Sequence, residues 1–434
     1  MMDDIKRRLV TCVIVILYMA LISISYVQYV YPAYGYMGFP VGKNIDFPFL
    51  IISAIFLSIV SFLVLPSDIF KPTDLLITIT FWLIILPSVS LIPVISTSDI
   101  YRKILTVLMF SLVLIIMKSI SMIKISMKFG MSEKYFAPIF YTFFVINMCL
   151  IIYYYRVNID SFLSMTSIKD LYNIRMTFRG DNNETPKLVE YLFFASSKVF
   201  IPFLFIKGLE NKSKTILILA FSCQMYLFLV TGSKSIFLGL FLVYVLWLFF
   251  HKYKKITSLS FSLLIFSVIF VSYSLFLIGY DQVINVIGRR AIIIPGMLTN
   301  VYLDFFSEHN FGFLGYSIFS KIVHYTYNTD PAFVIGKNVF ERPEMSANVN
   351  YIGSSFADFG YWGVIVFTFL ATLLYKFFDA CFYNTKDKVM ILSLLILPTW
   401  VLVDGSLITA MTTHGLLWIF FIFMFYPKGE ESDK

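Results

Sequence analysis

Charge-free apolar runs divide most of the chain into segments of membrane-spanning length. A helix that crosses a bilayer needs about 20 mostly apolar residues. Twelve intervals between charged positions meet this requirement. We expect them at 9–30, 47–65, 75–95, 104–123, 136–155, 188–206, 215–231, 235–250, 257–278, 360–375, 389–403 and 406–426. The pattern predicts an all-α polytopic membrane protein in which residues 1–434 form a single integral membrane domain.

Two long connections interrupt this series, at about 156–187 and 279–359. Loops longer than about 12–15 residues are usually functional or disordered. The second connection carries aromatic and aliphatic residues throughout, so we expect it to be partly helical. A helix over 291–306 is predicted to lie at the membrane surface and to break near Pro295 and Gly296.

The composition agrees with a membrane protein. Hydrophobic residues make up 59% of the 434 positions and charged residues only 14%, against about 45–50% and about 25% in soluble domains. This excludes a soluble enzyme, a disordered chain, a fibrous protein and a nucleic-acid-binding domain. The four cysteines and four histidines have no metal-ligand spacing, so we expect neither a metal nor another cofactor.

The distribution of basic residues predicts the orientation. Twelve spans place both termini on one side, and 19 of the 34 Lys and Arg fall there in short segments, so both termini should be cytoplasmic. Seventeen of these 19 are Lys, whereas seven of the nine Arg fall on the opposite side. Because Arg binds phosphate bidentately, we expect an anionic ligand there. The alternative is salt bridging to carboxylates on the same side.

Two basic sites precede the second long connection. Arg175 and Arg179 are spaced i, i+4 and would share one face of a helix, which suits a pyrophosphate or, alternatively, a solvated basic face. Lys234 lies in the turn Thr-Gly-Ser-Lys-Ser at 231–235. A cation beside the free N–H groups of a helix N-terminus resembles a small anion cradle. The alternative is a helix cap with a snorkelling lysine.

The second long connection collects the groups that glycosyl or acyl transfer requires. It contains cations for anion binding, carboxylates, a histidine and amides, although any single carboxylate is more often structural. These candidates are Arg289, Arg290, Asp304, Glu308, His309, Arg342, Asn348 and Asp358.

In the order of these motifs the chain resembles bacterial O-antigen and capsular polysaccharide polymerases of the Wzy type, and more distantly the O-antigen ligases. The resemblance runs from about 231 to 363. The matching residues are Gly232-Ser233-Lys234-Ser235, Gly288-Arg289-Arg290, Gly312, Gly315, Asp358, Gly360 and Gly363. Ligases usually carry Arg where this chain has Lys234. They also carry a His-Asn-type pair where it reads Asn348-Val349-Asn350, and both departures favour a polymerase.

The resemblance implies metal-independent glycosyl transfer at the periplasmic face of the bacterial inner membrane. A glycan on undecaprenyl pyrophosphate would pass to a repeat unit on the same lipid, with undecaprenyl pyrophosphate as leaving group. The implied catalytic residues are Arg289, Arg290 and His309. The general base is left unassigned, with His309 or a carboxylate of the same connection as the alternatives. The implied substrate-binding residues are Arg175, Arg179, Lys234, Arg342, Asn348 and Asp358.

The implied partners are the lipid-linked glycans, membrane lipid, a chain-length regulator and a flippase, and no nucleic acid. Two alternatives stay open at this stage. One is a flippase or transporter of the same lipid-linked oligosaccharide, and the other is an O-antigen ligase. A flippase should carry charges along several spans, whereas here the spans are nearly free of charge.

Overall fold

The computed structural model describes residues 2–41, 45–125, 130–157, 174, 178, 185–317 and 319–427. In these ranges the chain is helical except for loops and one short antiparallel pairing of β1 (Asp68–Ile69) with β2 (Ile256–Thr257). Ten helical stretches in the described part are long and apolar enough to cross a membrane. The chain is therefore an all-α protein with the helices of a multi-pass membrane protein, as the apolar pattern predicts.

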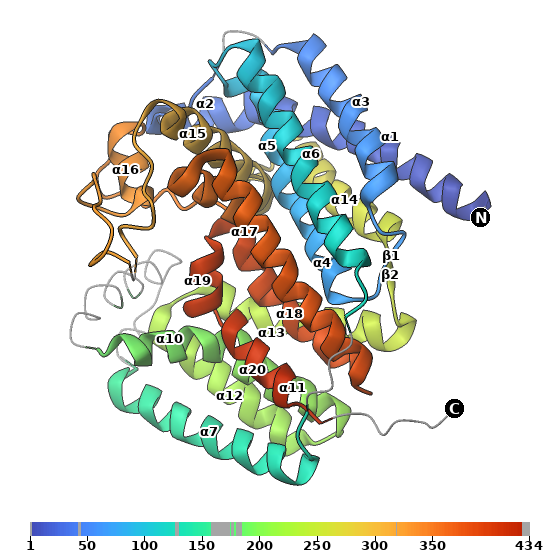
Figure 1. The fold of residues 1–434 in the computed structure, drawn as a ribbon, viewed down its shortest axis with the longest axis vertical. Helices are drawn as coiled ribbons and strands as arrows, with labels where there is room; N and C mark the ends of the chain where they lie inside the picture. The colour runs from blue at the N-terminus through green and yellow to red at the C-terminus, as the bar shows by residue number, and fades with distance from the viewer. Residues whose placement is uncertain are drawn as a thin grey trace. The chain divides into compact units, whose positions relative to one another are not determined.

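The chain groups into two compact units. The first unit comprises Met1–Lys124, Ile256–Lys376 and Val401–Leu407. Its helices are α1 (Met2–Ser25), η1 (Tyr26–Val30), α2 (Tyr31–Tyr34), η2 (Gly35–Met37), α3 (Phe47–Val64), α4 (Pro72–Ile79), η3 (Thr80–Ile85), α5 (Leu86–Ile95), α6 (Ile100–Met122), α14 (Ser258–Leu277), η6 (Ile284–Ile293), α15 (Ile294–Glu308), α16 (Pro331–Asn338) and the larger part of α17 (Tyr351–Asn384) (Figure 1).

The second unit comprises Ile125–Lys255, Phe377–Trp400 and Ile408–Lys434. Its helices are α7 (Glu133–Tyr154), α10 (Lys187–Ala195), η5 (Ser196–Phe200), α11 (Ile201–Glu210), α12 (Lys214–Thr231), α13 (Lys234–Tyr253), most of α18 (Lys388–Asp404), most of α19 (Leu407–Thr412) and α20 (Leu416–Phe425). An ionic cluster joins its segments, because the Lys207 ammonium lies 3.0 Å from Glu210 and 2.8 Å from Asp387.

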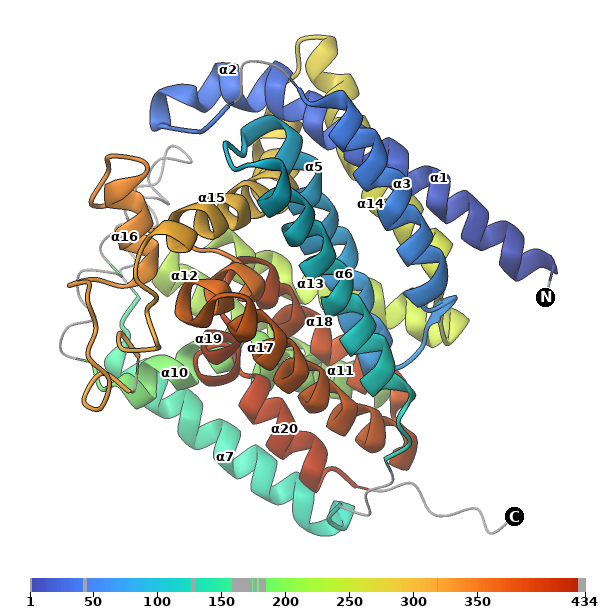
Figure 2. The ribbon, with the colours of Figure 1, turned by 45° about the horizontal axis from the view of Figure 1, so that its top comes forward.

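The core of the first unit is the helical run from Pro72 to Ile95, whose apolar residues are buried along its whole length. The helix α1 packs against α3, α5 and α14, and Figure 2 shows α1 beside α3 and α14. The helix α15 packs closely on α5. A Cβ at Gly296 would lie 2.5 Å from the carbonyl carbon of Pro87, so only glycine allows this approach.

The predicted surface helix at 291–306 is present, but two of its expected properties are wrong. It runs without a break through Pro295 and Gly296, from η6 into α15. It is also not a surface helix, because every residue from Pro295 to Leu303 is buried. The apolar side chains that suggested membrane contact instead fill the interior of the first unit.

Four π-helical stretches occur in the described part of the chain, and each is followed by a proline. η1, η3, η5 and η6 end two residues before Pro32, Pro87, Pro202 and Pro295. The residue before each proline makes an i to i−5 hydrogen bond, namely Tyr31 to Tyr26, Leu86 to Phe81, Ile201 to Ser196 and Ile294 to Arg289. Proline has no N–H, and its ring clashes with the carbonyl four residues earlier. Widening the preceding turn relieves this clash, so these prolines bulge the helices without ending them.

The structure moves the predicted boundaries near the C-terminus. α17 begins at Tyr351, nine residues before the predicted span at 360–375, and is interrupted by non-helical backbone at Phe359 and Gly360. Asn350 caps it, since its Oδ1 accepts the Gly353 N–H at 3.0 Å. The predicted spans at 389–403 and 406–426 correspond to the 17-residue α18 and to the short α19 and α20. Most of the first long connection, at 156–187, lies outside the described residues.

Candidate functional site: an arginine–tyrosine cluster

Arg289 is a buried cation that lies on an aromatic ring. It belongs to the π-helical stretch η6 and is 9% exposed. Its Cζ lies 4.0 Å from the centroid of the Tyr34 ring, well inside the limit of about 6 Å for a cation–π interaction. Its Nε donates to Asn285 Oδ1 at 3.0 Å. The guanidinium is thus held in one orientation by a ring and an amide.

No carboxylate among the described residues forms an ion pair with Arg289. Burial lowers the pKa of its guanidinium, while neighbouring Tyr34, Tyr29 and Tyr36 oppose this shift. Arginine nevertheless stays charged at any working pH. A buried charge without a counter-ion is costly, and its unused terminal N–H groups match the paired oxygens of a phosphate. The site therefore suits an exchangeable anion.

The tyrosine that carries Arg289 belongs to a larger aromatic group at the end of the first helical run. Tyr34 meets Tyr29 edge-on with 6.3 Å between ring centroids, and its centroid lies 6.4 Å from that of Phe39. Phe39 in turn contacts Phe340 at 5.9 Å. A left-handed turn at Gly38, with φ of +85°, brings this segment against Phe340, whose Cα would lie 3.2 Å from a Cβ at that glycine.

Arg342 lies on the same tyrosine segment. Its Cζ is 5.8 Å from the ring centroid of Tyr36, which is 74% exposed. Arg342 follows α16 in a turn that closes over Gly336, where a Cβ would lie 2.0 Å from the Met345 carbonyl oxygen. Arg289 and Arg342, from different parts of the second long connection, therefore contact the nearby tyrosines Tyr34 and Tyr36. We call Arg289, Arg342, Tyr29, Tyr34 and Tyr36 the arginine–tyrosine cluster.

Both arginines of the cluster are predicted from the sequence, but none of its tyrosines is. The available signal is local density, because five tyrosines occur between positions 26 and 36. Tyrosine is also common where any membrane helix meets the interface, so density alone does not predict ligand binding. Only their contacts with Arg289 and Arg342 distinguish Tyr34 and Tyr36 from an ordinary interfacial belt.

Arg290, Asn348 and Asp358 have different environments. Arg290 is exposed beside the cluster, and exposed Asn348 accepts a hydrogen bond from the Ser346 hydroxyl at 3.1 Å. Asp358 is 1% exposed. Its carboxylate accepts the Leu314 N–H at 3.1 Å and the Tyr316 hydroxyl at 3.0 Å. Both oxygens of Asp358 are thus used to hold the 312–316 turn on α17, where we expected substrate contact.

His309 is not brought to Arg289. It ends α15, is exposed, and stacks on Phe305 with 4.0 Å between ring centroids. Its Nδ1 lies 2.8 Å from the Phe305 carbonyl oxygen. Arg289 lies 20 residues earlier on the same helical run, which corresponds to roughly 30 Å along the axis. The two side chains therefore do not share one reacting centre.

The remaining predicted anion binders lie elsewhere or outside the described residues. Lys234 is the exposed first residue of α13, in the second unit. Beside it Thr231 Oγ1 accepts the Ser233 N–H at 3.2 Å, and the hydroxyls of Ser233 and Ser235 are 2.9 Å apart. These bonds order the turn that precedes α13, but no side chain caps the N-terminus of this helix. Arg175 and Arg179 lie outside the described residues.

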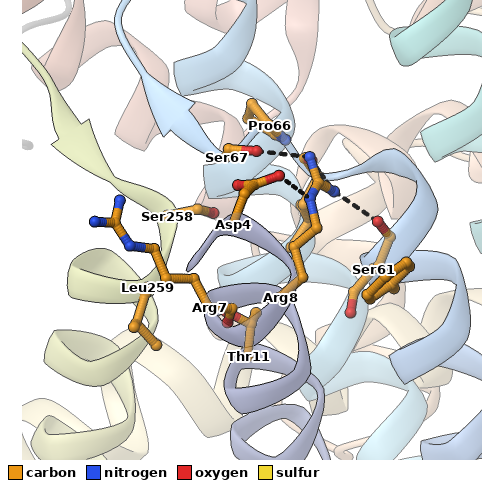
Figure 3. A pocket seen from close by; sticks show the side chains of 11 residues that line it. Asp4, Arg7, Arg8, Thr11, Ser61, Pro66, Ser67, Ser258 and Leu259 are labelled. Carbon is orange, nitrogen blue, oxygen red and sulfur yellow. Dashed lines mark hydrogen bonds and ion pairs between the residues drawn. The ribbon is translucent and has the colours of Figure 1, made fainter. Parts of the chain in front are cut away.

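Arg8 shows how an arginine of the same unit looks when its guanidinium serves the fold. Its guanidinium donates to the carbonyl oxygens of Phe62 at 2.6 Å and Leu65 at 3.2 Å, to Ser67 Oγ at 2.7 Å and to Asp4 at 3.2 Å. Figure 3 shows the bonds of Arg8 to Ser67 and Asp4, with the Arg7 guanidinium pointing away from them. Arg8 therefore caps the C-terminal end of α3, where carbonyls lack helical partners.

No group of three or more His, Cys, Asp or Glu in the described part of the chain is placed to hold a metal ion. Comparisons of the chain with protein-family models, with curated proteins and with solved structures give no match.

Proposed function

We propose that this protein polymerises undecaprenyl-pyrophosphate-linked oligosaccharide repeat units into O-antigen or capsular polysaccharide. The observation that carries the proposal is Arg289, a buried arginine stacked on Tyr34 without a carboxylate partner. Such a group provides a fixed positive charge for a pyrophosphate. The adjacent exposed ring of Tyr36 offers an apolar face of the kind that stacks on a sugar ring.

The reaction that we propose is a substitution at an anomeric carbon. A hydroxyl oxygen of the acceptor repeat unit attacks the anomeric carbon of the donor glycan and forms the new glycosidic bond. The bond from that carbon to the pyrophosphate oxygen breaks, and its electron pair leaves with undecaprenyl pyrophosphate. The proton of the attacking hydroxyl passes to water. Arg289 and Arg342 stabilise the charge that develops on the leaving pyrophosphate.

The proposed location is the bacterial inner membrane, with twelve crossings, both termini in the cytoplasm and the arginine–tyrosine cluster at the periplasmic face. The topology expected from the sequence supports this placement. The segments that carry Tyr34, Arg289 and Arg342 all lie on the same expected side, although they are far apart in sequence. Lipid-linked repeat units, a chain-length regulator and a flippase are the proposed partners.

The test is the surface glycan of a strain without this gene, resolved as a ladder on a gel. We expect single repeat units to reach the surface and the longer rungs to disappear. Accumulation of lipid-linked units inside the cell would indicate a flippase, and polymer that stays on its lipid carrier would indicate a ligase. Either result would overturn the proposal.

Complementation connects this test to the cluster. Wild-type protein should restore the ladder, whereas Arg289→Ala at the same protein level should not. Lys337→Ala is the matched control, because Lys337 is an exposed cation of α16 without a hydrogen bond or ion pair to a described residue. A full ladder from Arg289→Ala would remove the assigned pyrophosphate site.

A further inference from the structure

A strained turn follows α15 and presents a large apolar side chain outward. Phe313 and Leu314 have φ values of 48° and 59°. Residues with a Cβ adopt this left-handed conformation at a conformational cost, which glycine avoids. The fold nevertheless keeps Phe313 at a position where its side chain is 46% exposed. Backbone strain of this kind persists where the surrounding structure enforces it, and it is common at functional contacts.

The turn is fixed to α17 at the residues that precede the kink of this helix. Its three consecutive N–H groups from Gly312 to Leu314 are the donors. The acceptors are the carbonyl oxygens of Ala357 and Asp358, at 2.8 and 3.2 Å, and the Asp358 carboxylate, at 3.1 Å. Non-helical backbone at Gly360 interrupts α17 directly after these acceptors, where the carbonyls of a helix end need donors from elsewhere. The turn therefore holds a fixed position at the start of the expected span at 360–375.

The exposed ring of Phe313 begins a line of aromatic contacts that continues along α17. Its centroid lies 5.7 Å from that of Phe359, and the Phe359 centroid lies 6.3 Å from that of Phe367. α17 is one of the helices that are long and apolar enough to cross a membrane. Phe313 is therefore linked by ring contacts to a helix of membrane-spanning length.

The face of α17 that is exposed between the kink and Lys376 is apolar. Its exposed side chains recur at helical spacing and are those of Trp362, Val366, Phe369, Leu370 and Leu373. Because the chain has the helices of a multi-pass membrane protein, such a stripe faces lipid. Tryptophan is typical of the level of the lipid headgroups, so Trp362 marks where the bilayer begins. Phe359, the ring partner of Phe313, lies three residues before it in the sequence.

The loop between α15 and α16 carries two more exposed apolar side chains. Ile322 is 83% exposed, and Phe319 is also exposed. Single exposed apolar residues are ordinary in proteins, but several on one loop mark an interaction surface. Lys321 is exposed beside Ile322, and a lysine at a membrane interface keeps its ammonium in water while its methylene groups lie along apolar surface. The composition of this exposed surface therefore suits a membrane interface.

We propose that Phe313, Phe319 and Ile322 form an interfacial anchor, which inserts into the bilayer leaflet that contains Trp362. The anchor continues the lipid-facing stripe of α17, and burial of these side chains among lipids offsets the strain of the turn. The three side chains have no hydrogen-bonding group, so a bilayer suits them better than a hydrated glycan. The second long connection then lies partly in the membrane. This conclusion depends on membrane crossing alone and not on the proposed glycosyl transfer.

The experiment identifies the medium around each side chain in the full-length protein, reconstituted in vesicles of phosphatidylethanolamine and phosphatidylglycerol. Phe313→Cys and Ile322→Cys each carry a nitroxide label in a Cys149→Ser background, because Cys149 is the exposed member of the four cysteines. Asn328→Cys is the matched control, since Asn328 is an exposed polar residue of the same loop. Electron paramagnetic resonance measures how often each label collides with lipid-soluble oxygen and with a water-soluble nickel chelate. The signal of the Cys149→Ser protein alone is subtracted.

The ratio of oxygen to nickel collisions should be several-fold higher at positions 313 and 322 than at position 328. High access to nickel at both positions would place them in water, and low access to both reagents would place them against protein, for example a second copy of the chain. Either result would overturn the anchor. Ile322 lies outside the strained turn, so Ile322→Cys tests the proposal even if Phe313→Cys does not fold. No polymer is measured, so a failure of the proposed function leaves this result unchanged.

Discussion

Arg8 and Arg289 are both held tightly in the first unit, but their guanidinium groups are satisfied in opposite ways. Arg8 donates to two carbonyls, a hydroxyl and a carboxylate, so its N–H groups are committed to the fold. Arg289 donates to one amide oxygen and rests on a ring. The difference teaches that a fixed orientation alone does not identify a ligand-binding arginine. A ligand-binding arginine is better identified by the number of its guanidinium N–H groups that have no hydrogen-bond acceptor in the protein.

Charge-conserving substitutions should separate the two arginines most strongly. Arg289→Lys keeps the charge but loses the planar fork and its stacking, and we expect polymer formation to fall about 100-fold or more. Arg8→Lys should leave the rate per folded molecule within about twofold. Rates of repeat-unit addition by purified variants provide the measurement. Equal losses in both variants would show that neither arginine has a special role in the reaction.

Stability should change in the reverse order. Arg8→Ala leaves the carbonyls at the end of α3 without their donors, and we expect a loss of about 1–3 kcal/mol in the free energy of unfolding. Arg289→Ala removes a buried charge that has no carboxylate partner, so it should be neutral or slightly stabilising. Unfolding in detergent measures both. Arg7→Ala is the control, because the Arg7 guanidinium points away from the bonds that Arg8 makes.

The ring beneath Arg289 should contribute a smaller effect. Tyr34→Leu removes the aromatic face, and a cation–π interaction of about 0.5–2 kcal/mol corresponds to a rise of roughly two- to thirtyfold in KM for the lipid-linked substrate. Tyr34→Phe keeps the face and should stay within about twofold of wild type. If Phe and Leu are equally impaired, the hydroxyl of Tyr34 matters and not its stacking.

Arg342→Ala should have the smallest effect of these substitutions. Tyr36 is largely exposed, and charge interactions at exposed sites are screened by salt. We expect a loss of about two- to fivefold in kcat/KM that shrinks as ionic strength rises. A salt-independent loss would show that Arg342 acts in a desolvated site during the reaction.

The sequence predicts the helices of this protein well because their signal is local. Long apolar runs identify every long helix in the described part of the chain. The burial of α15 inside the first unit is not predictable in the same way. An apolar helix that contacts lipid and an apolar helix that is buried in protein have similar compositions. Gly296 is the only local sign of close packing there, and its contact with Pro87 is visible only in three dimensions.

The candidate site is predicted only in part for a related reason. Arg289 and Arg342 stand out because arginine is rare in this chain and concentrated on one expected side. The roles of Asp358 and His309 depend on distant partners, Tyr316 in one case and the length of α15 in the other. Tyr34 and Tyr36 contribute through contacts with residues about 250 or more positions away in the sequence, which no local pattern encodes.

The prolines that follow the π-helical stretches also change how helical wheels of this protein should be drawn. Each π-helical turn accommodates one more residue than an α-helical turn, which shifts the helix face by about 100° per extra residue. A wheel drawn continuously through 284–308 or 26–37 therefore assigns residues beyond the bulge to the wrong side. Insertion or deletion of one residue beside Pro32 or Pro295 would reset the phase of Tyr34 or Arg289 while the hydrophobic run stays intact.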